Sequence, residues 1–198
     1  MRTLIFLLTT LLLLSCSEAP KKKTTQTQKV EKEIVIPDSL LGKDWEGNEI
    51  LLGKVSYAQM THYTKEWFNA EYDRYKVNAS LIAKINPLLK DKTVVLLMGT
   101  WCEDSQREVP GMMKILAQSG YALDDMEIIA VDEDKRTPDG LEQNHALTYV
   151  PALIFYENGK EEINRIVEFP IGTLEEDIYA ILSGQDYKNA YAEWVPSF

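Results

Sequence analysis

The hydrophobic residues in the second half of this chain form two almost unbroken runs that predict buried strands. Thr93 to Met98 and Met126 to Val131 are apolar at nearly every position, as in a strand covered on both faces. Between them, Gln106 to Ser119 places apolar residues three and four positions apart, which predicts an amphipathic helix. Gly120 suits the C-terminal end of this helix, and Pro110 should either kink it or lie near its first turns.

The pattern continues with a short helix, a strand pair and a last helix. Leu141 to Leu147 predicts the short helix. Ala152 to Tyr156 and Ile163 to Val167 are strand-like and are joined by "ENGK", whose Asn-Gly pair is typical of a hairpin. Thr173 to Leu182 predicts the last helix, with Thr173 as its N-cap. The predicted order is β-α-β-α-β-β-α, which is an α/β fold.

Upstream of these elements the pattern is helical. Thr61 to Ala83 carries aromatic and aliphatic residues at helical spacing, and Asn78 or Ser80 is a candidate cap for a second short helix that ends before Pro87. The stretch "ILLGKVSYAQM" contains either a short strand or only an apolar cover. We divide the chain into a signal peptide (1–15), a disordered tether (16–36), an N-terminal helical extension (37–92) and a core with a C-terminal tail (93–198).

The N-terminus is typical of an exported protein. Leu4 to Leu14 is apolar but too short to cross a bilayer, which takes about 20 residues. "LLSC", ending at Cys16, resembles the bacterial lipobox, so Cys16 is the predicted lipidation site; the alternative is an ordinary signal peptide with an incidental cysteine. Lipidation implies a lipid-anchored protein of the bacterial cell envelope. Ser17 after the cysteine favours the outer membrane. The periplasmic side of that membrane is the expected location, and nothing in the sequence decides which way the domain faces.

The net charge and the cysteine content argue against several classes of function. The formal net charge of -10 argues against a nucleic-acid surface, which needs clustered Lys and Arg. The chain has two cysteines, so if Cys16 carries lipid, Cys102 is a lone thiol and no internal disulfide is possible. No spacing of His, Cys and carboxylate residues predicts a metal site, and no cofactor is expected.

The stretch "GTWCEDS" and the stretch "YVPALIFYENGK" together resemble the thioredoxin family. Trp101 and Cys102 close the first central strand, in the place of the family's Trp-Cys-x-x-Cys motif. Pro151 begins the strand that runs into the hairpin, as in the family's cis-proline segment. The resemblance covers Val94 to Leu182, and it implies the thioredoxin fold, a central mixed β-sheet flanked by helices, here with the N-terminal helical extension.

The resemblance also implies roles for these residues. Cys102 would be a nucleophile at a helix N-terminus, where free N–H groups and the helix dipole favour a thiolate. Trp101 would shield one side of the sulfur. Pro151 would lie across from the thiol, and the backbone of Val150 could pair with a bound peptide.

Several positions depart from the family pattern. Ser105 stands where the second cysteine would be, so a dithiol mechanism is impossible within the chain; its hydroxyl could still donate a hydrogen bond to the Cys102 thiolate. Leu96 stands where the family has a buried Asp. Asp104 is a candidate substitute or only a residue that favours the helix start. Acidic residues beside the thiol oppose thiolate formation whereas Arg107 favours it, and the net sign stays open.

Two functions are compatible with these residues. The first is a membrane-tethered monothiol disulfide reductase or thiol-transfer protein, in which Cys102 attacks the disulfide of a protein or small molecule and an external thiol resolves the product. The second is a redox-silent thioredoxin-fold module that binds a peptide or protein in the groove beside Pro151. Whether the protein is an enzyme stays open at this point.

Overall fold

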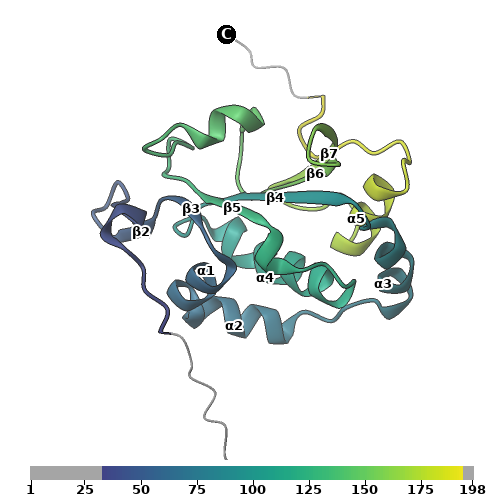
Figure 1. Cartoon of the computed structure of the whole chain (residues 1–198), viewed down its shortest axis with the longest axis horizontal. Coiled ribbons are helices and arrows are strands. Elements are labelled where there is room, and N and C mark those ends of the chain that lie inside the picture. Colours follow the sequence, from purple (N-terminus) through teal and green to yellow (C-terminus); the bar gives the residue numbers. More distant parts are fainter. Residues whose placement is uncertain (1–32, 194–198) are drawn as a thin grey trace, which may run out of the picture. The chain divides into compact units, whose positions relative to one another are not determined.

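A computed structural model describes residues 33–193 of the chain, which form a mixed sheet with helices (Figure 1). The predicted signal peptide, the lipidation site Cys16 and most of the predicted tether lie outside the described residues. Within 33–193, no helix is both long enough and apolar enough to cross a membrane.

The sheet has five strands in the order β3-β5-β4-β6-β7. The central strand β4 runs parallel to β5 and antiparallel to β6, and the edge strands β3 and β7 are antiparallel to their neighbours. The expected mixed α/β sheet is therefore confirmed. The bounds of these strands are β3 (Gly53–Val55), β4 (Lys92–Met98), β5 (Glu127–Ala130), β6 (Ala152–Glu157) and β7 (Glu161–Val167).

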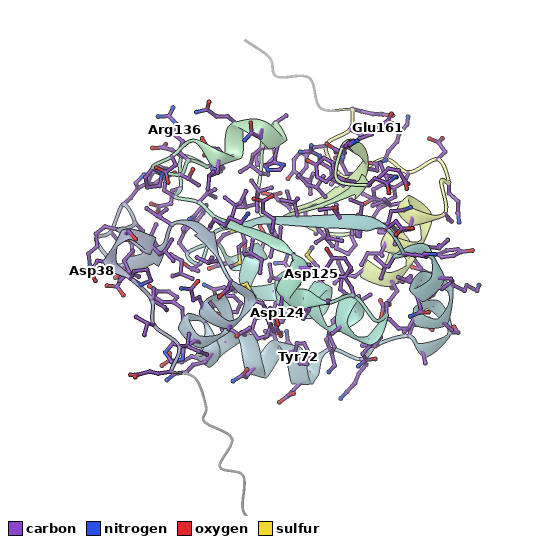
Figure 2. The ribbon with its side chains drawn as sticks, in the orientation of Figure 1. Asp38, Tyr72, Asp124, Asp125, Arg136 and Glu161 are labelled. Atoms are coloured by element: carbon purple, nitrogen blue, oxygen red, sulfur yellow. The ribbon has the colours of Figure 1, made fainter. Side chains whose placement is uncertain are left out.

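Both faces of β4 are buried, which explains its unbroken apolar run. Leu96 and Met98 pack into the hydrophobic cluster between the sheet and the α-helices, whereas Val95 and Leu97 belong to a second hydrophobic cluster on the opposite face of the sheet. Figure 2 shows side chains filling the space on both sides of the sheet. A polar residue at any of these positions would therefore lose contact with water.

The helices α1 to α5 gather on one face of the sheet (Figure 1), and the 3-10 helix η4 (Leu141–His145) belongs to a segment that covers the other. The expected short helix at 141–147 is thus a single 3-10 segment. Its neighbours Gly140 and Ala146 both adopt left-handed backbone conformations, which end the helical geometry on either side. The α-helices are α1 (Tyr57–Tyr63), α2 (Lys65–Arg74), α3 (Ala79–Ile85), α4 (Glu103–Gln118) and α5 (Leu174–Leu182).

The predicted helical stretch Thr61 to Ala83 is divided into three helices. Thr64 separates α1 from α2, and its hydroxyl donates a 2.7 Å hydrogen bond to the Met60 carbonyl one turn back. Asn78 caps α3, because its side-chain oxygen accepts hydrogen bonds from the backbone of Ser80 and Leu81. Short 3-10 segments at Asp38–Leu40, Asn86–Leu88 and Leu123–Asp125 complete the helical elements of the described chain.

The interval 37–92, expected as a helical extension, also contains three short strands. β1 (Leu41–Lys43) and β2 (Glu49–Leu51) form a separate antiparallel pair. β3 joins the main sheet beside β5, so part of "ILLGKVSYAQM" is a strand. The polar turn between β1 and β2 is held by Asp44, whose carboxylate accepts hydrogen bonds from the backbone of Glu46 and Asn48.

Candidate functional site: the Cys102 groove

Cys102 is the last residue of the short segment 99–102 that links the end of β4 to the start of α4. Its backbone N–H donates to the Gly99 carbonyl at 3.1 Å, and it occupies the N-cap position of α4. The helix therefore begins at Glu103, three residues earlier than the apolar pattern predicts, because its first turn is polar. Cys102 is 8% exposed, and it is the free cysteine of the described residues.

The segment that faces the sulfur is Val150–Pro151, as expected from the resemblance. The Cys102 thiol donates a hydrogen bond to the Val150 carbonyl, with an Sγ–O distance of 3.4 Å. The peptide bond between Val150 and Pro151 is cis. The Pro151 carbonyl accepts a 2.8 Å hydrogen bond from the backbone of Glu168, which joins this segment to the end of β7.

Trp101 lies beside the thiol and is fixed from two directions. Its indole N–H donates to the Val131 carbonyl, which follows β5, at 2.9 Å. The ammonium of Lys135 lies 5.7 Å from the centre of the indole ring, in cation–π contact, and donates to the Glu133 carbonyl. The loop after β5 therefore supplies one wall of the site.

Ser105 is fully buried on the first turn of α4, and its hydroxyl supports the turn before the helix. Its oxygen accepts a 3.3 Å hydrogen bond from the backbone N–H of Gly99. No hydrogen bond joins Ser105 to Cys102 in the part of the chain that the structure describes. Leu96, also buried, packs into the cluster on the helical face, whereas Cys102 belongs to the cluster on the opposite face.

Arg107 is held by two carboxylates on its own helix. Its guanidinium pairs with Asp104 and, at 2.7 Å, with Glu108. The hydrogen bonds to Glu108 and then Asp104 raise the pKa of Arg107 above its ordinary value. Because the single Arg107 cation is shared by two carboxylates, this helical turn keeps a net negative charge. Arg107 is not among the residues that line the groove beside the thiol.

The thiol opens onto a groove of about 440 Å³. We call it the Cys102 groove. Four of its lining residues were named from the sequence: Trp101, Cys102, Asp104 and Val150. Lys135 and Glu168 were not, because they lie far from the motif along the chain. Glu103 and Tyr149 were also not named, although each directly adjoins a named residue. The lining residues are Trp101, Cys102, Glu103, Asp104, Lys135, Tyr149, Val150 and Glu168.

The C-terminal segment supports the far wall of the Cys102 groove. Tyr191 stacks on Tyr149, with ring centres 4.3 Å apart, and its hydroxyl donates a hydrogen bond to the Glu168 carboxylate. That hydrogen bond, followed by burial, raises the pKa of Tyr191 to about 12. The tail after α5 thus holds two groove residues in place, a function that its sequence does not reveal.

The arrangement combines an N-cap thiol, an aromatic shield and a backbone carbonyl facing the sulfur. No group of three or more His, Cys, Asp or Glu side chains among residues 33–193 is arranged to hold a metal ion. The groups that the site presents are the sulfur itself and the charged and apolar side chains around it.

The chain is similar to known proteins in sequence and in fold. A thioredoxin family model matches residues 53–180. A search of curated proteins found no match. Among solved structures, a protein of unknown function from Pseudomonas aeruginosa is 14% identical, with a TM-score of 0.52 over 66% of this chain and 93% of its own. Trxlp from Edwardsiella tarda EIB202 is 19% identical, with a TM-score of 0.34 over 54% of this chain and 94% of its own.

Proposed function

The chain belongs to the thioredoxin family, and from this premise we propose that Cys102 is a redox-active thiol that works with a single sulfur. The Cys102 thiolate attacks a substrate disulfide, a new S–S bond forms to one substrate sulfur, and the other sulfur leaves as a thiolate that takes a proton from water. An external thiolate then attacks this mixed disulfide. It forms a disulfide with the substrate sulfur and releases the Cys102 thiolate.

The observation that carries this proposal is the position of the sulfur at the start of α4. The N-cap side chain of Cys102 makes no hydrogen bond to its helix. N–H groups in the first turn of a helix that lack a cap are available to an acceptor, and they stabilise negative charge. Loss of the thiol proton would end the donation to the Val150 carbonyl and turn the sulfur into such an acceptor.

An external thiol is needed to resolve the mixed disulfide, because the chain does not supply a second thiol at the site. The sequence holds two cysteines, Cys16 and Cys102, and Ser105 cannot attack a disulfide. If Cys16 is lipidated in the bacterial cell envelope, as "LLSC" indicates, no sulfur within the chain can resolve the mixed disulfide. The substrate and the reductant are then a protein or small-molecule disulfide and a separate thiol.

Alkylation tests the proposal directly. The rate of iodoacetamide labelling at pH 7 should exceed that of free cysteine, and incubation with 2-hydroxyethyl disulfide should add one mercaptoethanol group to Cys102. A Cys102→Ser variant separates this labelling from that of Cys16, and Ser183→Ala is a matched control away from the site. Labelling of native Cys102 at or below the rate of free cysteine, with no mixed disulfide, would remove the redox role.

A second function, a redox-silent module that binds an extended peptide beside Pro151, is favoured by one observation. The Cys102 side chain is largely buried and already hydrogen-bonded to Val150. In this case the Cys102→Ser variant should bind partners as the wild type does. In the redox case, partners trapped by the wild type should be released by reductant and absent from the variant.

Membrane tethering through Cys16 is proposed on the sequence alone. Expression in a bacterium fed labelled palmitate should label the wild-type chain, and the Cys16→Ser variant should lose both the label and membrane association. Fractionation of inner and outer membranes then tests the expected outer-membrane location, and protection from added protease in intact cells tests the expected periplasmic side.

A further inference from the structure

We propose that the Cys102 groove selects disulfides that carry positive charge, such as those flanked by ammonium or guanidinium groups. This inference rests on the proposed redox role of Cys102 and names the substrate class for it. It is carried by the charges that line the groove and by the partners that each of them has.

The lining of the Cys102 groove is predominantly acidic. Glu103, Asp104 and Glu168 contribute three carboxylates, and Lys135 contributes one ammonium group. The fully ionised lining therefore has a net charge of -2, on a chain whose formal net charge is -10. The charges come from three separate elements, the first turn of α4, the loop after β5 and the end of β7.

The partners of these carboxylates leave most of the negative charge in place. Asp104 pairs with Arg107, but that guanidinium is shared with Glu108. Glu168 accepts a hydrogen bond from the neutral hydroxyl of Tyr191. Among the described residues, neither Glu103 nor Glu168 makes an ion pair with a cation. Two carboxylates therefore face an incoming molecule without neutralisation.

The ammonium group that lines the groove already has partners within the protein. The Lys135 ammonium lies over the Trp101 ring and donates to the Glu133 carbonyl. An anionic disulfide would meet the two unneutralised carboxylates and the negative turn of α4, whereas a cationic disulfide would be attracted by the same groups.

The reaction itself strengthens this preference. When the Cys102 thiolate attacks, negative charge spreads over the attacking and leaving sulfurs, and the departing thiolate must form beside Glu103 and Glu168. An ammonium or guanidinium on the leaving fragment offsets that charge. In water, the interaction between two unit charges about 7 Å apart changes the rate of an encounter by roughly threefold. The reaction rates of a cationic and an anionic disulfide should therefore differ by about tenfold at low salt.

Small disulfides of matched size test the proposal with the full chain. The probes are cystamine (cationic), 2-hydroxyethyl disulfide (neutral) and 3,3′-dithiodipropionate (anionic). Rates of mixed-disulfide formation at Cys102 are measured by mass spectrometry and divided by the rates with free 2-mercaptoethanol, which corrects for the leaving thiols. Thiopyridyl-activated peptides with Lys-Cys-Lys or Glu-Cys-Glu sequences then distinguish a polypeptide substrate from a small cationic one.

We expect a normalised cationic-to-anionic ratio of about ten at low salt. It should fall towards one in 1 M KCl and in the Glu103→Gln/Glu168→Gln variant, and it should be unchanged in Asp73→Asn, which removes a carboxylate from α2. A ratio near one with rapid reaction of the neutral probe would overturn the charge preference while leaving the redox role intact. No reaction with any probe would overturn both.

Discussion

Replacing Ser105 with cysteine should give the site the second sulfur that it lacks. Cys102 is the N-cap of α4 and Ser105 is the third residue of the helix. These are the two positions that face each other in a capping box, where the side chain of each reaches the backbone of the other. We therefore expect the variant to form a disulfide between residues 102 and 105 on oxidation, without movement of the helix.

The size of the effect follows from the loop and from one hydrogen bond. A disulfide that closes four residues stabilises the fold by about 2 kcal/mol in the chain-entropy model. The substitution weakens the bond from the buried Gly99 N–H, now 3.3 Å from the serine oxygen. That loss costs about 1 kcal/mol, because sulfur is a weak acceptor. The reduced variant should thus be slightly less stable than wild type and the oxidised one slightly more.

Thermal melting with and without dithiothreitol measures this difference. For a domain of this size, about 2 kcal/mol between the two redox forms corresponds to a shift in Tm of roughly 4–8 °C. Ser105→Ala loses the same hydrogen bond but should melt identically in both conditions. If the oxidised Ser105→Cys variant keeps two free thiols at these positions in native protein, the two side chains are not adjacent, and the placement of Cys102 at the N-cap is wrong.

Three further predictions concern the packing behind the site. Glu175→Ala should lower the free energy of unfolding in urea by about 3 kcal/mol or more, because the buried carboxylate accepts hydrogen bonds from the Tyr75 hydroxyl and the Asn78 N–H; an effect below 1 kcal/mol would contradict this. Gly111→Ala should cost about 1 kcal/mol net, since the new methyl group would lie 2.8 Å from the Tyr75 ring and this overpacking outweighs the gain in helix propensity; stabilisation would show that the ring moves freely. Burial, followed by hydrogen bonding to a carboxylate, raises the pKa of Tyr75 and Tyr187. The stability that these protonated groups contribute is therefore complete below about pH 10 and is lost above it. Urea midpoints measured at pH 8, 10 and 11 should fall steeply in wild type and less in the Tyr75→Phe/Tyr187→Phe variant.

The strands and the last helix could be predicted because their signals are local. The run Thr93 to Met98 corresponds to β4, and Thr173 caps α5 with a complete capping box to Glu176. Local signals failed where a single side chain changes the backbone. Thr64 ends α1 by bonding to the carbonyl of Met60, and nothing in the aromatic spacing around it distinguishes a break from a continuous helix.

The charged residues of the fold were the least predictable. Glu175 and Asp177 look like surface acids at the start of α5, yet both are buried. Both carboxylates can be buried because other groups donate hydrogen bonds to them. Glu175 accepts a hydrogen bond from the Tyr75 hydroxyl, about 100 residues away along the chain. Asp177 accepts hydrogen bonds from the backbone of Ile171 and the hydroxyl of Tyr187. A sequence reveals which residues have charge, but not which distant donors will satisfy them.

The same limit applies to the Cys102 groove, and it bears on how the site works. The sequence locates the thiol and the segment that faces it, but the acidic balance of the groove depends on Lys135 and Glu168, both of which have left-handed backbone conformations in loops. Leu96 is apolar where the family has a buried acid, and the Ser105 hydroxyl accepts from Gly99, so neither residue supplies the sulfur with a hydrogen bond. Stabilisation of a thiolate must then come from the first turn of α4, against the carboxylates around it. A substrate that brings its own positive charge would supply what the groove lacks, so reactivity and substrate charge should be linked in this protein.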